Sequence, residues 1–169
     1  MHRGLREPHL FNAGPNPLKL INNLEGLIDQ NALTNLRKEI DRNVVLLFKL
    51  GISHYQFACA AERTEWRHRI SRYYYGAYNV KRAVALKNSG QFSTDSSDHK
   101  AIDQIPSEMT NAAAFRVRLV NLRDDRNLAD YSHLAVVGDL LSPPDDWERF
   151  VHDFIESARQ YLTSQQVQL

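Results

Sequence analysis

The sequence predicts an all-α protein, and three observations support this fold class. Apolar residues recur at spacings of three and four along several stretches, which is the period of a helix with one face on a core. No stretch of useful length alternates apolar and polar residues as a half-buried strand does. The chain of 169 residues contains only seven glycines and six prolines, which disfavours an all-β chain with many turns. Its length and 43% hydrophobic content suit one domain with its own core.

The N-terminal residues differ in character from the rest of the chain. Residues 1–16 contain several prolines and glycines, and we expect an extended arm there. Asn16 followed by Pro17 is typical of a helix start, because the amide caps free backbone N–H groups and the ring fixes φ. A short helix should follow. We therefore divide the chain into an N-terminal arm with a short helix, residues 1–33, and a helical domain, residues 34–169.

The first long helix is expected to run through Leu33 and Leu47, with one apolar face and one charged face. Gly51 is expected to end or bend it. Residues 53–62 are compact and alanine-rich and should be helical again. The central helix should then run from Thr64, as its cap, to about residue 87.

Two rows of side chains characterise the central helix. The first has near-heptad spacing and consists of Trp66, Ile70, Tyr73, Ala77, Val80 and Val84. The second contains Tyr74 and Tyr78, four residues apart, whose rings can stack along the helix. A tyrosine row at this spacing favours packing in a core or a dimer over a role in stacking a substrate.

The segment after the central helix is expected to be irregular. Residues 88–98 are a polar loop with turn residues throughout. A short helix from His99 to about Ile105 should follow and stop at Pro106. The next long helix should begin at about Asn111.

The last helix is expected to begin at Pro144, after a break at residues 138–144. Acidic residues follow this proline, where the helix dipole favours them. The broad apolar face of the helix comprises Trp147, Phe150, Val151, Phe154, Ile155, Ala158 and Leu162. The tail, residues 163–169, should fray.

Residues 123–133 combine charged and aromatic side chains at high density. Apolar positions upstream end at Leu122, and continuing the same helix face reaches Arg126 and then His133. If the helix persists, the Cα atoms of these two residues lie about 10 Å apart, and both side chains can converge on one small anion. An ordinary helix end, with solvated charges and a hydrogen-bonded buried histidine, is the alternative that spacing alone favours.

Several kinds of site are missing from the sequence. It has no glycine-rich phosphate loop, no histidine pair at helical metal spacing and no serine nucleophile motif. Cys59 is the single cysteine, which excludes an internal disulfide and fits a reducing cytoplasm. No secretory signal and no apolar run long enough to cross a bilayer is visible. We therefore expect a cytoplasmic protein that needs no metal or cofactor and does not act in a membrane.

The net charge of +1 hides an asymmetry along the chain. Residues 63–126 hold twelve Lys or Arg against seven Asp or Glu, a local charge of +5. Residues 127–169 hold two against seven, a local charge of −5. The basic segment could attract a phosphate polymer or the acidic segment of a second subunit, and solvated helix faces are the plainer alternative.

Arg126 and His133 suit phosphoryl chemistry that needs no metal. Histidine titrates near neutral pH, so it can exchange a proton with a nucleophile or a leaving oxygen. Arginine stays charged and can stabilise negative charge that develops on phosphorus. RNA carries its own nucleophile, the 2′-hydroxyl, and an enzyme acting on it needs little beyond acid–base help, positive charge and alignment. Asn127, Asp130 and Tyr131 are candidates to support the pair.

Three segments of the chain resemble the HEPN domain family. Residues 70–79, Ile-Ser-Arg-Tyr-Tyr-Tyr-Gly-Ala-Tyr-Asn, look like the second helix of these domains. Residues 98–102, Asp-His-Lys-Ala-Ile, are similar to the segment that opens the next helix in many members. Arg126-Asn127 followed by His133 resembles the family's motif of an arginine, a polar residue and a histidine.

The resemblance implies an antiparallel bundle of four to five helices with an N-terminal extension, often assembled as a homodimer. It also implies a metal-independent endoribonuclease that acts as a toxin or phage-defence effector. Such a toxin commonly has a cognate antitoxin, often a minimal nucleotidyltransferase. Carried over by position, Arg126 and His133 would be catalytic and Asn127 would support them. Five arginines are candidates for RNA backbone contacts, namely Arg69, Arg72, Arg116, Arg118 and Arg123.

Two other functions are compatible with the sequence. Some members of the family no longer cleave RNA, so a catalytically inactive interaction module is the first alternative. There, Arg126 would form a structural ion pair with Asp130 or Asp125, and the acidic last helix would bind another protein. A plain helical dimer of unknown role is the second.

Overall fold

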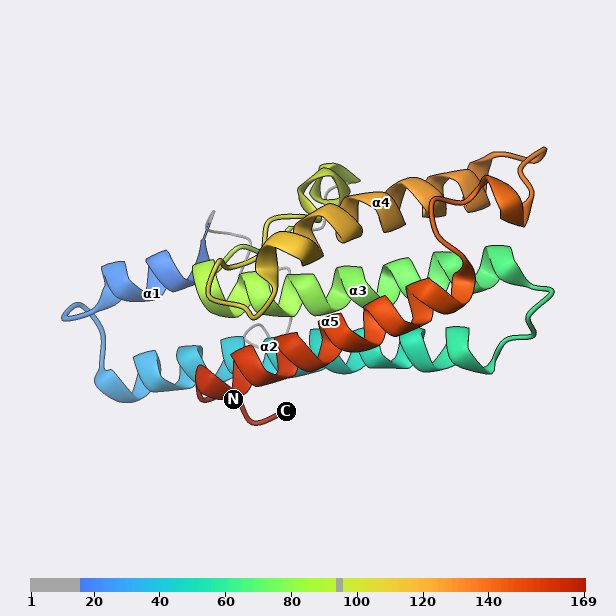
Figure 1. Cartoon of the computed structure of the whole chain (residues 1–169). Coiled ribbons are helices and arrows are strands. Elements are labelled where there is room, and N and C mark those ends of the chain that lie inside the picture. Colours follow the sequence, from blue (N-terminus) through green and yellow to red (C-terminus); the bar gives the residue numbers. More distant parts are fainter. Residues whose placement is uncertain (1–15, 94–95) are drawn as a thin grey trace.

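The computed structural model describes residues 16–93 and 96–169, and these residues form an all-α bundle without strands (Figure 1). Its α-helices are α1 (Pro17–Leu24), α2 (Gln30–Ala60), α3 (Trp66–Ser89), α4 (Ala112–Tyr131) and α5 (Pro144–Ser164). Two short 3-10 helices, η3 (Ser96–Ala101) and η4 (Val137–Asp139), lie in the connections. Successive long helices run in opposite directions, and α3 lies at the centre in contact with α2, α4 and α5. The prediction of an all-α bundle with an N-terminal extension is confirmed.

The expected N-terminal arm lies outside the described residues except for Asn16. The predicted helix start is confirmed, because Asn16 Oδ1 accepts a hydrogen bond from Lys19 N at 2.9 Å and Pro17 opens α1. The next helix, α2, begins at Gln30 under an Asp29 cap. The boundary drawn between residues 33 and 34 therefore falls within the first turns of α2 rather than ahead of it.

Gly51 does not end the first long helix, so the expectation of a helix end there is wrong. Helix α2 continues through it to Ala60. A Cβ at Gly51 would lie 2.6 Å from Val80 Cγ2 and 2.8 Å from the carbonyl oxygen of Gly76, both on α3. Glycine is therefore required for the close approach of α2 to α3 and not for a break in the chain.

The central helix α3 buries the predicted stripe almost completely. Ile70, Tyr73, Ala77, Val80 and Val84 have no exposed surface. The tyrosine row is also confirmed: the Tyr74 and Tyr78 rings stack with centroids 5.9 Å apart, and both residues are buried. The helix begins at Trp66, and its N-cap position is Glu65 rather than Thr64.

The C-terminal half differs from expectation in two places. The short helix predicted from His99 to Ile105 is instead the 3-10 helix η3, which begins and ends earlier. The tail does not simply fray, because Val167 is buried and its N–H donates to the carbonyl of Leu162 at 3.0 Å. Helix α5 begins at Pro144 as predicted, and its apolar face packs on the core, with Phe115 and Phe154 in edge contact at 5.4 Å.

Among the described residues, none of the helices combines the length and the apolar character that crossing a membrane requires.

Candidate functional site

Residues 123–133, the stretch dense in charged side chains, cover the C-terminal end of α4, and the helix stops before His133. Tyr131 is the last helical residue, and Ser132 has an extended backbone. The Arg67 guanidinium of α3 donates to the carbonyls of Ala129 and Ala135, at 2.6 Å each, and so ties the last turn to the loop that follows it. His133 is exposed in that loop, so the expected helical alignment of Arg126 with His133 is wrong.

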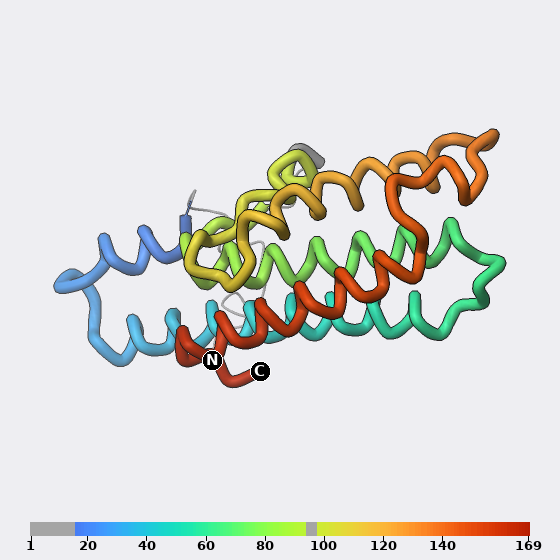
Figure 2. The backbone as a smooth tube through the Cα atoms, in the orientation of Figure 1, coloured from blue at the N-terminus to red at the C-terminus, as the bar shows by residue number. Residues whose placement is uncertain are grey.

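The loop that returns from α4 to α5 can be followed in Figure 2. It is fixed by Asp125, a buried carboxylate. It accepts hydrogen bonds from Leu141 N at 2.8 Å, Ser142 N at 3.3 Å and Trp147 Nε1 at 2.7 Å. Asp125 therefore stabilises this loop, and the partners of Arg126 are other residues.

Arg126 is held on several sides at once, and its side chain is only 12% exposed. Its Nη2 donates to Tyr75 Oη at 2.5 Å, and its Nη1 lies near Asn127 Oδ1 at 3.1 Å and Tyr131 Oη at 3.2 Å. Its Nε is 2.8 Å from Asp130 Oδ2, an ion pair whose geometry is too bent for a hydrogen bond. The guanidinium is thus preorganised, with one carboxylate and three polar side chains as partners.

Arg126 opens into a pocket of about 740 Å³, which we call the Arg126 pocket. Its lining residues come from α3, η3 and α4 and are Tyr74, His99, Lys100, Arg123, Asp124, Arg126, Asn127 and Tyr131. The lining includes three permanently charged cations, Lys100, Arg123 and Arg126, and a single carboxylate. That carboxylate, Asp124, is already engaged by Arg123, whose Nη2 lies 2.9 Å away. The pocket therefore carries excess positive charge.

His99 enters the Arg126 pocket from η3, a placement that the sequence did not predict. Its Nδ1 is 2.6 Å from Tyr74 Oη, and its ring stacks on Tyr78 with centroids 4.3 Å apart. Burial, and next the positive charge of Arg126, lower the pKa of His99 below the usual histidine value. Burial raises the pKa of Tyr74, so its phenol keeps its proton.

The position of His99 depends on its neighbour Asp98, which fastens η3 to α3. Tyr78 Oη donates to Asp98 Oδ2 at 2.9 Å, and Lys81 Nζ lies 3.7 Å from Oδ1. Lys81 is fully buried, and desolvation lowers its pKa although Asp98 opposes the change. A buried ion pair thus holds the segment that carries the imidazole.

The five arginines expected to contact RNA have different surroundings. Arg69 is buried against the carboxylates of α5, Arg116 donates to the carbonyl of Ile105 at 2.8 Å, and Arg118 lies over the Trp147 ring at 4.9 Å. Each of these three contributes to the packing of the bundle. Arg123 lines the Arg126 pocket.

Arg72 lines a second hollow, of about 640 Å³. Tyr75 and Asp130, both partners of Arg126, also line it. Arg72 Nη1 lies 3.1 Å from His54 Nδ1, and its guanidinium lies over the Phe57 ring. Two hollows that contain arginine side chains are therefore lined in part by partners of Arg126.

Comparisons with protein families, with curated proteins and with solved structures found no match to this chain. Within residues 16–93 and 96–169, no three His, Cys, Asp or Glu side chains are grouped so as to hold a metal ion.

The Arg126 pocket combines features that suit a phosphate ester with an attached base. Arg126, Arg123 and Lys100 supply positive charge, and Asn127 supplies an amide. Tyr131, 72% exposed, presents a ring beside the guanidinium on which a base could stack. His99 supplies a group that can exchange a proton near neutral pH.

Proposed function

We propose that this protein is a metal-independent endoribonuclease of the HEPN type, acting as a toxin or phage-defence effector. The observation that carries the proposal is the Arg126 pocket, in which a fixed guanidinium opens into a hollow with excess positive charge. A polyanion is the ligand class that such a pocket attracts.

Arg126 is the residue suited to stabilise the transition state. Its guanidinium is fixed by Tyr75 and Asp130 before any ligand arrives, so little reorganisation is needed during the reaction. Asn127 can orient the arginine or a phosphate oxygen, since its Oδ1 is 3.1 Å from Nη1. Arg123 and Lys100 would bind neighbouring phosphates of the same strand.

The proposal includes a homodimer, as the family resemblance implies. Beside the pocket, the end of α4 and the following loop expose large apolar side chains: Tyr131, Leu134, Val136, Val137 and Leu141. A second copy of the chain would remove this surface from water. His133 lies in the same loop, so the contact would also enclose its imidazole. A monomeric mass by light scattering at micromolar concentration and low salt would contradict the dimer.

The decisive test of the proposed activity is cleavage of single-stranded RNA in the presence and absence of EDTA. We expect cleavage to be unaffected by the chelator and to leave 2′,3′-cyclic phosphate and 5′-hydroxyl ends. Loss of cleavage in EDTA, or products with 3′-hydroxyl ends, would contradict the proposed mechanism. The identical oligodeoxynucleotide is the matched control and should remain intact, because it lacks the nucleophile.

A catalytically inactive HEPN interaction module is the second candidate, and the Arg126–Asp130 ion pair favours it. In that case the guanidinium serves mainly to hold the end of α4. Arg126→Ala would then lower the melting temperature, and the wild-type protein would leave RNA intact while binding another protein, such as a nucleotidyltransferase-like antitoxin.

A further inference from the structure

We propose that His99 is the general base of this site and accepts the proton of the attacking 2′-hydroxyl. The role rests on the proposed ribonuclease activity and names the proton acceptor within it. His133, the histidine indicated by sequence spacing, is exposed beyond the end of α4 and does not line the Arg126 pocket.

His99 and Arg126 converge on one pocket from different elements. Both line the same pocket, His99 from η3 and Arg126 from α4. Tyr74 of α3 contacts both of them: its Oη is 2.6 Å from His99 Nδ1, and its ring centre is 5.5 Å from the Arg126 guanidinium carbon. A phosphate bound by Arg126 therefore lies within the space that the imidazole also lines.

The His99 ring is held in one orientation. Its face stacks on Tyr78, and its Nδ1 is engaged by Tyr74. The proposed role requires the tautomer in which Nδ1–H donates to Tyr74 Oη, because the lone pair for proton transfer is then on Nε2. General base catalysis further requires Nε2 to lie within hydrogen-bond reach of the 2′-hydroxyl once RNA is bound.

The charges around His99 favour its neutral form. The groups that face it come from three elements: Tyr74, Tyr75, Tyr78, Lys81 and Arg82 of α3, Asp98 and Lys100 of its own segment, and Arg123 and Arg126 of α4. Asp98 favours the imidazolium, whereas burial and the cations, Arg126 first among them, disfavour it. The net effect lowers the pKa of His99, so the ring is neutral and able to accept a proton at pH 7.

The proposed step is a transesterification. His99 Nε2 takes the proton of the 2′-hydroxyl as the 2′-oxygen forms its bond to phosphorus. The bond from phosphorus to the 5′-oxygen breaks, and that oxygen leaves with a proton from water. The imidazolium then returns its proton to water. Arg126 stabilises the added negative charge on the phosphoryl oxygens during the step.

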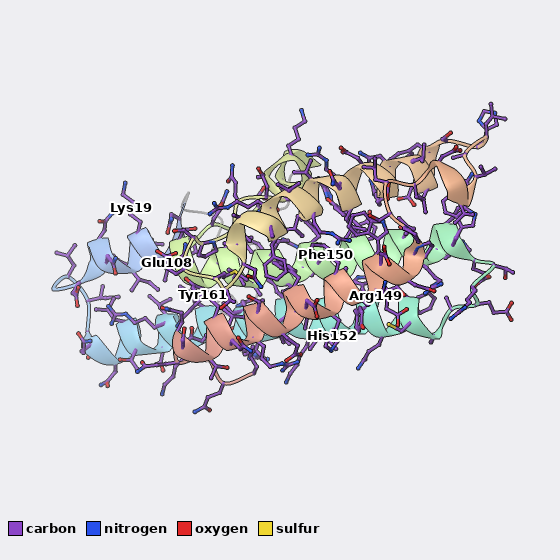
Figure 3. The ribbon with its side chains drawn as sticks, viewed as in Figure 1. Lys19, Glu108, Arg149, Phe150, His152 and Tyr161 are labelled. Carbon is purple, nitrogen blue, oxygen red and sulfur yellow. The ribbon has the colours of Figure 1, made fainter. Side chains whose placement is uncertain are left out.

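The test compares three histidine variants in cleavage of a short oligoribonucleotide in EDTA. His99→Gln should lower the rate by roughly 10²–10⁴-fold, the usual contribution of a positioned base, with oligonucleotide affinity close to wild type. His152→Ala is the matched control, because it removes an exposed imidazole from α5 (Figure 3), and it should cleave normally. A wild-type rate in His99→Gln, or loss of cleavage in His133→Ala alone, would overturn the assignment.

The two proposals can fail separately. If the wild-type protein does not cleave RNA, the ribonuclease function is wrong, and the role of His99 is lost with it. If the wild-type protein cleaves and His99→Gln cleaves equally well, only the role of His99 is wrong.

A second measurement uses the wild-type protein and so does not depend on folding of a variant. The His99 imidazole is titrated by NMR with and without an oligodeoxynucleotide, which binds without being cleaved. A bound phosphate next to the ring should raise the pKa of His99, because negative charge favours the imidazolium. No change in that pKa at saturating oligonucleotide would contradict the placement of the phosphate beside His99.

Discussion

Arg69 and Arg126 are both largely buried, and both fasten helices of the bundle beside tyrosine rings, yet they differ in how their charge is balanced. Arg69 of α3 is 3.0 Å from Asp145 and 3.0 Å from Glu148, so two carboxylates of α5 face one guanidinium. Arg126 of α4 has a single carboxylate partner, Asp130, at 2.8 Å.

The difference extends to the surroundings of each arginine. The Arg69 cluster is closed by Tyr73, whose hydroxyl donates to Glu148 at 2.7 Å. Arg126 instead opens into a pocket that adds Arg123 and Lys100. The two side chains are similarly buried, at 6% and 12% exposed. Charge balance, rather than burial, thus separates an arginine that serves packing from one that is available to a ligand.

The largest expected effect is loss of cleavage in Arg126→Ala. Removing a preorganised cation from the transition state should lower the rate by roughly 10²–10³-fold. Arg149→Ala, on α5 (Figure 3), is the control because it removes an exposed arginine outside the pocket. The measurement is the cleavage rate of an oligoribonucleotide in EDTA. Equal rates in the two variants would show that the unbalanced charge at Arg126 has no catalytic use.

The second effect concerns stability at the other arginine. The double variant Asp145→Asn, Glu148→Gln leaves the Arg69 charge buried without a counter-charge, because the Arg69 side chain is only 6% exposed. We expect the free energy of unfolding to fall, because the guanidinium stays charged while both of its partners become neutral. Urea denaturation followed by circular dichroism measures it. An unchanged denaturation midpoint would mean that Arg69 does not need its carboxylates.

The third effect is smaller, and here the substitution is expected to strengthen RNA binding rather than to weaken a property. Asp130→Asn removes the single carboxylate partner of Arg126, so the pocket becomes more positive. Stability should fall by about 1 kcal/mol or less, as for other partly exposed ion pairs, while RNA binding at low salt becomes tighter. The slope of log affinity against log salt should steepen by about 1 at most. Fluorescence anisotropy across a salt series measures both quantities, and weaker binding in Asp130→Asn would contradict the comparison.

The fold was accessible from the sequence because its helices are strongly periodic. The buried stripe of α3 and the apolar face of α5 follow the predicted positions. Gly51 was misinterpreted because its role depends on Val80 and Gly76 of another helix. Glycine has the same local preference whether it stops a helix or lets one pass close to a neighbour, so the sequence alone could not distinguish the two.

Only part of the candidate site could be predicted from the sequence, for the same reason. Arg126, Asn127 and Tyr131 lie close together in the sequence, and they also meet in the structure. His99 was not predicted, because its partner Tyr74 is 25 residues away and the contact depends on how η3 folds onto α3. Continuing the helical rhythm predicts that His133 aligns with Arg126, but α4 ends at Tyr131, where Arg67 of α3 binds the last turn. Contacts between elements, which local spacing does not contain, decided each of these outcomes.

The smallest expected effect separates the two arginines by the pH at which each influences stability. Arg69 lowers the pKa of Asp145 below its usual value of 3.8, chiefly by a hydrogen bond. Burial and Arg126 lower the pKa of His99 below its usual value of 6.5. In both cases the unfolded chain binds the proton more readily, so stability is fully present above the unfolded value and declines as pH falls through the window below it.

We therefore expect the melting temperature to decline in two windows, one beginning below about pH 6.5 and one below about pH 3.8. His99→Gln should weaken the upper decline without abolishing it, because burial also lowers the pKa of His54. Asp145→Asn should weaken the lower decline and leave the upper one unchanged. Differential scanning calorimetry between pH 8 and pH 3 measures both. If His99→Gln left the upper decline intact, the His99 imidazole would not be held neutral beside Arg126. The charge imbalance at Arg126 would then have no effect on the histidine that the proposed chemistry uses as its base.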